Sequence, residues 1–130
     1  MRCVIALDTT LRLLAECAVP PHALVAPTLL RSEVVRDLYR AAQRGEIDRK
    51  EADARLDHFR ALKPRLLGDR VLQRKAWDLA ERLGWDDTGP AEYAALTLLQ
   101  ADAFVTLDHD KARELDGIVP LASYDDLLTD

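Results

Sequence analysis

Four acidic residues stand where side chains from distant parts of the chain can meet. Asp8 and Asp108 each directly follow an apolar run, Asp110 comes two residues after Asp108, and Glu33 lies within a mostly apolar stretch. Carboxylates that converge in a partly buried site repel one another and are costly to ionise unless a cation neutralises them. Oxygen ligands suit Mg²⁺ or Mn²⁺, which can activate water and stabilise charge on a phosphodiester. These positions therefore predict a nuclease-type metal site.

Each acid also has a simpler interpretation. Asp8 and Asp108 can be helix N-caps with no further role, because each stands between an apolar run and a helical pattern. Glu33 can pair with Arg36 or Arg40 of its own helix. Asp110 can be an exposed surface charge. Spacing alone thus predicts an acidic cleft and no specific reaction.

The elements that must position these acids alternate along the chain. Short apolar runs predict strands over residues 2–7, 23–26, 103–107 and 118–121. Amphipathic patterns predict helices from about 9 to 17, from 28 to 44, over 48–62 and 70–83, from the turn at 86–90 to about 99, from 108, and over 124–128. Residues 64–68 are predicted to be a loop. This alternation predicts an α/β fold with a small, mostly parallel sheet, whose functional crevice lies beyond the carboxyl ends of the strands.

Several local features predict how single elements begin and pack. Asp8 or Thr9 is expected to cap the first helix, and Asp48 is expected to cap the helix over 48–62, with Glu51 completing a capping box. Trp77 stands at helical spacing and is predicted to lie in the core. Trp85 flanks a turn and is predicted to be either a core or a contact residue.

Length and composition limit the possible number of domains and the kinds of partner. The chain has 130 residues and 48% hydrophobic residues, which predicts one domain, 1–130, with a sizeable core. A net charge of −5 disfavours nucleic-acid binding through net charge but leaves room for a locally basic rim. Cys3 and Cys17 are expected to be buried thiols of a reduced cytoplasm. No signal peptide or membrane span is recognisable, so we expect a soluble cytoplasmic domain.

Several common enzyme classes lack support in the sequence. There is no HExxH or Cys/His zinc spacing, no glycine-rich dinucleotide or phosphate-binding loop, and no Gly-x-Ser-x-Gly elbow. A receiver-like phosphotransfer domain would need an adjacent pair of acids after an early strand, whereas Asp8 stands alone. The acidic constellation therefore remains the leading candidate site.

Four segments, in order, resemble motifs of the PIN-domain ribonucleases. Val-Ile-Ala-Leu-Asp8-Thr-Thr10 resembles the opening of these proteins. The stretch from Pro27 to Glu33 resembles their second motif, where a Glu follows a Pro in an early helix. Residues 91–96 and 103–110 resemble their C-terminal half. The resemblance covers nearly the whole chain, and within the family it is most similar to the VapC-type toxins of toxin–antitoxin pairs.

This resemblance implies a fold, an activity and a set of site residues. The fold would be a PIN-like three-layer sandwich with a mostly parallel sheet of four to five strands flanked by helices. The activity would be that of a Mg²⁺- or Mn²⁺-dependent endoribonuclease, the toxin of a type II toxin–antitoxin system. The metal ligands it implies are Asp8, Glu33, Asp108 and Asp110, of which Asp8, Glu33 and Asp108 would be catalytic. Thr10 and Thr106 would orient carboxylates or contact phosphate.

One position departs from the family pattern. Pro90 stands where these toxins usually carry a third acid. Glu92 lies two residues further on, about 200° around an ideal helix, and Asp87 lies three residues earlier. Either can be the missing ligand, with Glu92 favoured by its longer side chain. The departure also supports an alternative function, a catalytically degenerate PIN-like module that binds a partner or RNA.

The expected partners follow from the same resemblance. They are an RNA substrate, a cognate VapB-type antitoxin lying near the second to fourth helices, and a second copy of the chain in a homodimer; no membrane is expected. Basic residues close in sequence to the acids can supply a rim for the phosphate backbone. These residues are Arg12, Arg31, Arg36 and Lys111.

Overall fold

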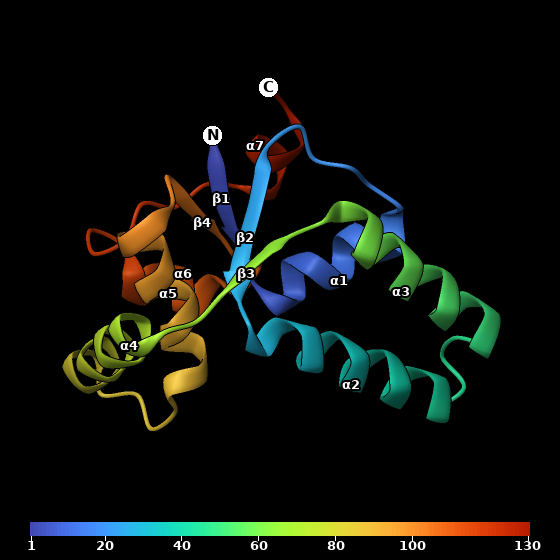
Figure 1. The fold of residues 1–130 in the computed structure, drawn as a ribbon, viewed down its shortest axis with the longest axis horizontal. Helices are drawn as coiled ribbons and strands as arrows, with labels where there is room; N and C mark the ends of the chain where they lie inside the picture. Colours follow the sequence, from blue (N-terminus) through green and yellow to red (C-terminus); the bar gives the residue numbers. More distant parts are fainter.

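A computed structural model describes all residues, 1–130, and has a four-stranded parallel sheet at its centre (Figure 1). The strands are β1 (Arg2–Ile5), β2 (Ala23–Pro27), β3 (Arg65–Leu67) and β4 (Ala103–Val105). Their order in the sheet is β3-β2-β1-β4, and every neighbouring pair is parallel. The carboxyl ends of all four strands therefore meet at one edge of the sheet.

Seven helices surround this sheet and complete a three-layer α/β sandwich. They are α1 (Leu7–Glu16), α2 (Leu29–Gln43), α3 (Arg49–Leu62), α4 (Arg70–Leu83), α5 (Thr88–Gln100), α6 (His109–Leu115) and α7 (Tyr124–Leu128). Figure 1 shows α1, α2 and α3 to one side of the sheet and α4, α5 and α6 to the other. The predicted fold class is confirmed.

The central elements are the most apolar ones. In β1, Cys3, Val4 and Ile5 are completely buried, as expected of a strand covered on both faces. Helix α5 packs between the sheet and α4, so that residues around most of its circumference are buried. Small alanine side chains allow this close approach from both sides.

Two predictions about strands are corrected by the structure. Residues 64–68 are not all loop, because Arg65–Leu67 form β3 at one edge of the sheet. This strand has three residues and only half-buried leucines, so it carries no long apolar run. The strand predicted over 118–121 reduces to a single bridge between Phe104 and Leu121. Pro120 has no N–H to extend the ladder, and the chain turns into α7 soon afterwards.

The beginnings of two helices can be compared with their predicted caps. Helix α1 begins at Leu7, with Ala6 as an N-cap that makes no side-chain bond, so the predicted cap at Asp8 or Thr9 is wrong. The predicted cap of α3 is confirmed, because the Asp48 side chain accepts from the backbone N–H of Glu51 at 2.7 Å. The Glu51 carboxylate pairs with Arg55 at 2.9 Å, so the capping box is not reciprocal.

Two side chains predicted to be buried lie at the surface. The buried positions of α4 are Leu72, Ala76, Leu79 and Ala80. Trp77 is not among them and is 65% exposed, so its predicted core position is wrong. Cys17 follows the last turn of α1 in the left-handed conformation and is exposed, whereas Cys3 is buried as predicted.

None of the seven helices combines the length and the apolar character that crossing a membrane requires.

Candidate active site

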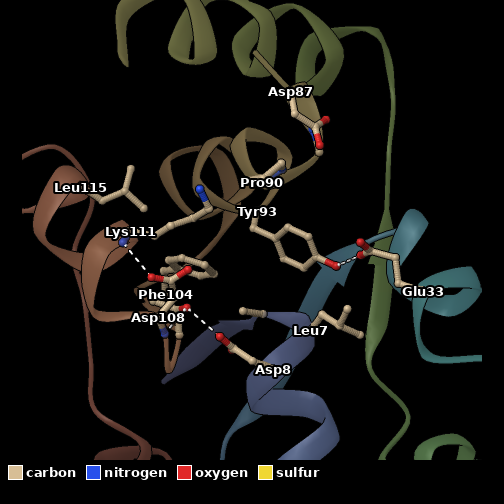
Figure 2. A pocket seen from close by; sticks show the side chains of 13 residues that line it. Leu7, Asp8, Glu33, Asp87, Pro90, Tyr93, Phe104, Asp108, Lys111 and Leu115 are labelled. Atoms are coloured by element: carbon tan, nitrogen blue, oxygen red, sulfur yellow. Dashed lines mark hydrogen bonds between the residues drawn. The ribbon is translucent and has the colours of Figure 1, made fainter. Parts of the chain in front are cut away.

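A cavity of about 290 Å³ opens at the carboxyl ends of the strands. Figure 2 shows its walls, which come from the start of α1, from the end of β4 and from α2, α5 and α6. The charged residues that line it are Asp8, Glu33, Asp87, Asp108 and Lys111. Three acids predicted from separate segments, Asp8, Glu33 and Asp108, therefore line one pocket.

Asp8 lies in the first turn of α1 and is held through one of its two oxygens. Its Oδ1 accepts from the Thr9 backbone N–H at 2.6 Å, from the Thr9 hydroxyl at 3.1 Å and from the Leu107 N–H at 3.2 Å. Its Oδ2 accepts only a long bond, 3.4 Å, from the Thr106 hydroxyl. Asp8 therefore keeps an oxygen that can bind a further partner.

Thr106 and Asp108 connect the end of β4 to Asp8. The Thr106 hydroxyl, besides donating to Asp8, accepts from the Asp108 backbone N–H at 3.2 Å. Asp108 is the N-cap of α6, and its Oδ1 accepts from the N–H groups of Asp110 and Lys111 at 3.0 and 3.1 Å. Its Oδ2 accepts no hydrogen bond within the chain. The cap thus occupies one oxygen of Asp108 and leaves the other available, so the N-cap and site interpretations of this residue are compatible.

The structure brings Thr9 to Asp8 and leaves Thr10 away from it. The Thr10 hydroxyl donates to the carbonyl of Ala6 at 2.8 Å inside α1, and the side chain is completely buried. The Thr9 hydroxyl, in contrast, is shared between Asp8 and the carbonyl of Val105. Thr9 therefore takes the orienting position that the resemblance implied for Thr10.

Glu33 reaches the pocket from α2 and is bonded to a tyrosine of α5. The Tyr93 hydroxyl donates to Oε1 of Glu33, as the dashed line in Figure 2 shows. Burial raises the pKa of Glu33, and the Tyr93 bond and the nearby charge of Arg36 oppose that rise only in part. Glu33 has no ion pair with Arg36 or Arg40. Its charge is therefore half-buried without a salt-bridge partner.

Tyr93 lies in the stretch 91–96 that resembles a family motif and lines the pocket, although the sequence predicted no role for it. Its side chain is nearly fully buried, and its ring packs against Phe104 with centroids 6.3 Å apart. Burial, followed by the bond to Glu33, raises the pKa of its hydroxyl. The signal that could have found it is spacing, because position 93 lies one helical turn after Pro90.

The two candidates for the missing third acid differ in position. Pro90 is the third residue of α5, where its missing N–H is not needed, and it lines the pocket. Asp87 caps the same helix by accepting from Gly89 N–H at 2.9 Å, and it also lines the pocket. Glu92 does not line it. Burial and then the charges of Glu33 and Asp87 raise the pKa of Glu92. Asp87 is thus the better placed of the two.

Asp110 is not brought into the pocket. It lies on the outside of α6, its side chain is 78% exposed, and it forms an ion pair with Arg113. Its backbone N–H, and not its carboxylate, contributes to the site by donating to Asp108. The structure therefore agrees with the simpler interpretation of this acid as a surface charge.

Of the four predicted basic residues, one lines the pocket. Lys111 of α6 does so. Arg12 lies one turn further along α1 than Asp8, where it pairs with Glu16 at 3.0 Å and covers the ring of Tyr124. Arg31 and Arg36 are exposed on α2. The basic rim is therefore limited to Lys111 and the exposed arginines near Glu33.

The donor set of the pocket suits a hard divalent cation. Asp8, Glu33, Asp87 and Asp108 each accept hydrogen bonds chiefly through one oxygen and keep the other available. No three His, Cys, Asp or Glu side chains are close enough to enclose an ion as they now lie. Mg²⁺ commonly binds through one or two carboxylates together with water and substrate phosphate, so a complete protein cage is not required.

The sequence matches no protein-family model and no curated protein. Among solved structures it is similar to the crystal structure of PAE2754 from Pyrobaculum aerophilum, with a TM-score of 0.79. The similarity covers 98% of this chain and 93% of that chain, at 20% sequence identity. At this identity the similarity supports the fold alone, and it extends over the whole three-layer sandwich.

Proposed function

We propose that this protein is a Mg²⁺- or Mn²⁺-dependent endoribonuclease and the toxin of a type II toxin–antitoxin system. The observation that carries the proposal is the pocket itself, because Asp8, Glu33 and Asp108, which come from three distant segments, line one cavity at the carboxyl ends of the strands. Together with the ordered motifs that resemble the PIN-domain ribonucleases, this arrangement favours hydrolysis of RNA phosphodiesters.

The residues that would hold the ion are Asp8, Glu33 and Asp108, with Asp87 next to them in the pocket wall. A bound divalent cation supplies Lewis-acid activation of water and stabilisation of charge on the phosphodiester. The chain holds its carboxylates ready for this, because backbone N–H groups fix Asp8 and Asp108 and the Tyr93 hydroxyl fixes Glu33. Lys111 adds a positive charge that can bind a phosphate of the substrate.

The partners proposed with this activity are RNA, a VapB-type antitoxin and a second copy of the chain. A pocket lined by four acids and one lysine suits an inserted Arg or Lys side chain of an antitoxin. A cytoplasmic location belongs to the same proposal, because the RNA substrate is there. Co-purification with the protein encoded by a neighbouring gene tests the antitoxin, and light scattering tests the homodimer.

A catalytically degenerate PIN-like module is the second candidate. Two observations favour it: Pro90 stands in the pocket wall where the family carries an acid, and no three acidic ligands converge in the structure. Such a module would bind RNA or a protein partner without cleaving. Metal-dependent cleavage separates it from the nuclease.

The deciding experiment follows cleavage of structured RNA on a gel while the antitoxin-free protein is titrated with Mn²⁺ and Mg²⁺. We expect cleavage that appears with metal, disappears with chelator and falls more than about 100-fold in Asp8→Asn. The asparagine Oδ1 can still accept from Thr9 and Leu107, so the fold should survive. Asp125→Asn, at an exposed acid of α7, is the matched control and should cleave normally.

Two outcomes would count against the nuclease. If Asp8→Asn cleaves like the unaltered protein, the acidic pocket is not the active site. If the folded protein neither binds metal nor cleaves RNA, the degenerate module becomes the leading interpretation.

A further inference from the structure

We propose that a second cavity, next to the acidic pocket and lined by both tryptophans of the chain, binds an unpaired base of single-stranded RNA. This inference rests on the proposed function, because the base would belong to the RNA that the acidic pocket cleaves. It adds a binding subsite outside the metal site and restricts the substrate to RNA with an exposed base.

The second cavity measures about 240 Å³ and lies where α4 ends and α5 begins. Its lining residues are Trp77, Ala80, Glu81, Trp85, Asp86, Asp87 and Thr88. Asp87 also lines the acidic pocket, so the two cavities share part of a wall. One continuous strand of RNA can therefore contact both.

Trp85 is fixed between the second cavity and α6. Its indole N–H donates to the carboxylate of Glu114. The ammonium of Lys111 lies 4.4 Å from the centre of its ring, in the range of a cation–π contact. Because Lys111 lines the acidic pocket while Trp85 lines the second cavity, this contact connects the two. The ring is held in place before any ligand binds.

Trp77 forms an exposed wall of the same cavity. It is 65% exposed, which is unusual for the largest apolar side chain. Its indole N–H donates to Glu81 one turn further along α4, at 3.2 Å. Both tryptophans thus have their only polar atom satisfied, so what they can offer a ligand is the ring surface. Aromatic rings of this kind are the usual stacking partners of unpaired bases.

The polar groups of the cavity indicate which part of a nucleotide enters it. Glu81, Asp86 and Asp87 are all hydrogen-bond acceptors when ionised. They repel phosphate and favour the donor groups of a base, such as the exocyclic amino groups of cytosine, adenine and guanine. The phosphate instead suits Lys111, which takes part in no ion pair of the chain. The base therefore goes to the tryptophans and the phosphate to the lysine.

Duplex RNA does not fit this arrangement. Its bases are stacked on one another and paired, so an aromatic side chain can reach one only after it is unpaired. Single-stranded loops and ends present bases at no such cost. The proposed subsite thus predicts a preference for single strands.

Tryptophan fluorescence of the 130-residue chain tests the proposal in the presence of chelator, so that no cleavage takes place. The probes are a short single-stranded RNA of mixed sequence and the same RNA annealed to its complement. We expect the single strand to quench the fluorescence and the duplex to bind more weakly. Trp77→Ala should weaken single-strand binding about tenfold, the loss typical of one base–aromatic contact.

A matched control comes from the same helix. Val71 is 61% exposed on α4 and does not line the second cavity, so Val71→Ala should bind like the unaltered protein. Lys111→Gln should weaken binding and reduce its salt dependence, while saturating RNA still quenches the fluorescence. If Trp77→Ala binds the single strand with unchanged affinity, or if the duplex binds equally well, the proposal is wrong.

The two proposals can fail separately. If the unaltered protein does not cleave RNA but Trp77→Ala still loses single-strand affinity, the base subsite stands and the nuclease falls. If the protein cleaves RNA, Asp8→Asn abolishes cleavage and Trp77→Ala binds and cleaves normally, the nuclease stands and the base subsite falls.

Discussion

The molecule contains two tyrosine–glutamate hydrogen bonds whose effects on the glutamate are opposite. In the acidic pocket the Tyr93 hydroxyl donates to Glu33, and between α7 and α1 the Tyr124 hydroxyl donates to Glu16 at 2.7 Å. Each bond joins residues far apart in the chain. Yet the pKa of Glu16 is lowered, and that of Glu33 is raised.

The difference comes from what else surrounds each carboxylate. Glu16 lies at the surface, and its pKa is lowered first by the Tyr124 bond and then by Arg12, which pairs with it at 3.0 Å. Glu33 is half-buried, and desolvation outweighs both the Tyr93 bond and the more distant Arg36. A hydrogen bond to a tyrosine therefore does not decide the charge state of a glutamate when burial is the larger effect.

Glu16 belongs to a structural contact, whereas Glu33 belongs to the candidate active site. At Glu16 every partner stabilises the ionised form, which suits a contact that holds α7 against α1. At Glu33 the ionised form is left without a cation, and the neighbouring Glu92 is raised in pKa as well. Carboxylates whose ionised form lacks a compensating positive charge are common at functional sites, where a bound ligand supplies that charge.

The largest expected effect is on activity. Glu33→Gln should reduce Mn²⁺-dependent RNA cleavage more than about 100-fold, because it removes a charged metal ligand. Glu16→Gln should cleave like the unaltered protein. Initial cleavage rates at saturating Mn²⁺ measure both, with circular dichroism as the check on folding. Equal activities of the two variants would contradict the assignment of Glu33 to the site.

The next effect is on stability, and it uses the tyrosines. Tyr93→Phe should lower the free energy of unfolding near neutral pH by about 1–3 kcal/mol, because a half-buried carboxylate loses its hydrogen-bond donor. Tyr124→Phe should cost less, since Glu16 keeps Arg12 and water as partners. Urea denaturation of both variants gives the two values. A larger loss for Tyr124→Phe would mean that Glu33 is better solvated than its burial indicates.

The acidic residues of the site could be predicted from the sequence, but the side chains that hydrogen-bond to them could not. Asp8 and Asp108 were predictable because a residue that directly follows a buried parallel strand must lie at the carboxyl edge of the sheet. Glu33 was predictable because its helical position lies beside the buried stripe of α2. Tyr93 was missed as the partner of Glu33 because 60 residues separate them. Their contact depends on how α2 and α5 pack, which no local pattern contains.

A small error in the predicted start of α1 was enough to exchange the threonine that lies beside Asp8. Helix α1 begins at Leu7, earlier than its predicted cap at Asp8 or Thr9. Thr10 thereby comes one helical turn after Ala6 and donates to its carbonyl, while Thr9 reaches Asp8. The exposure of Trp77 could not be predicted either. Spacing shows which residues share a helical face, but it does not show whether another element covers that face.

The two glutamates should also affect the pH dependence of stability, by small amounts of opposite sign. The raised pKa of Glu33 means that the folded protein binds its proton more tightly than the unfolded chain does. The resulting stability is complete below the ordinary value of 4.5 and is lost as the pH rises through the folded pKa. For Glu16 the pKa is lowered, so its stabilising contribution is present above 4.5 and is lost as the pH falls through the folded pKa.

In the presence of chelator, the two glutamine substitutions should therefore shift the melting temperature in opposite directions. Near neutral pH, Glu33→Gln should melt at a higher temperature than the unaltered protein, and Glu16→Gln at a lower one. Glutamine can still accept from either tyrosine, so the change isolates the charge. Because ionised Glu33 also raises the pKa of Glu92, its removal relieves two carboxylates together. Melting temperatures measured from neutral pH down to below 4.5 should converge for both variants, and shifts of the same sign would show that burial does not dominate at Glu33.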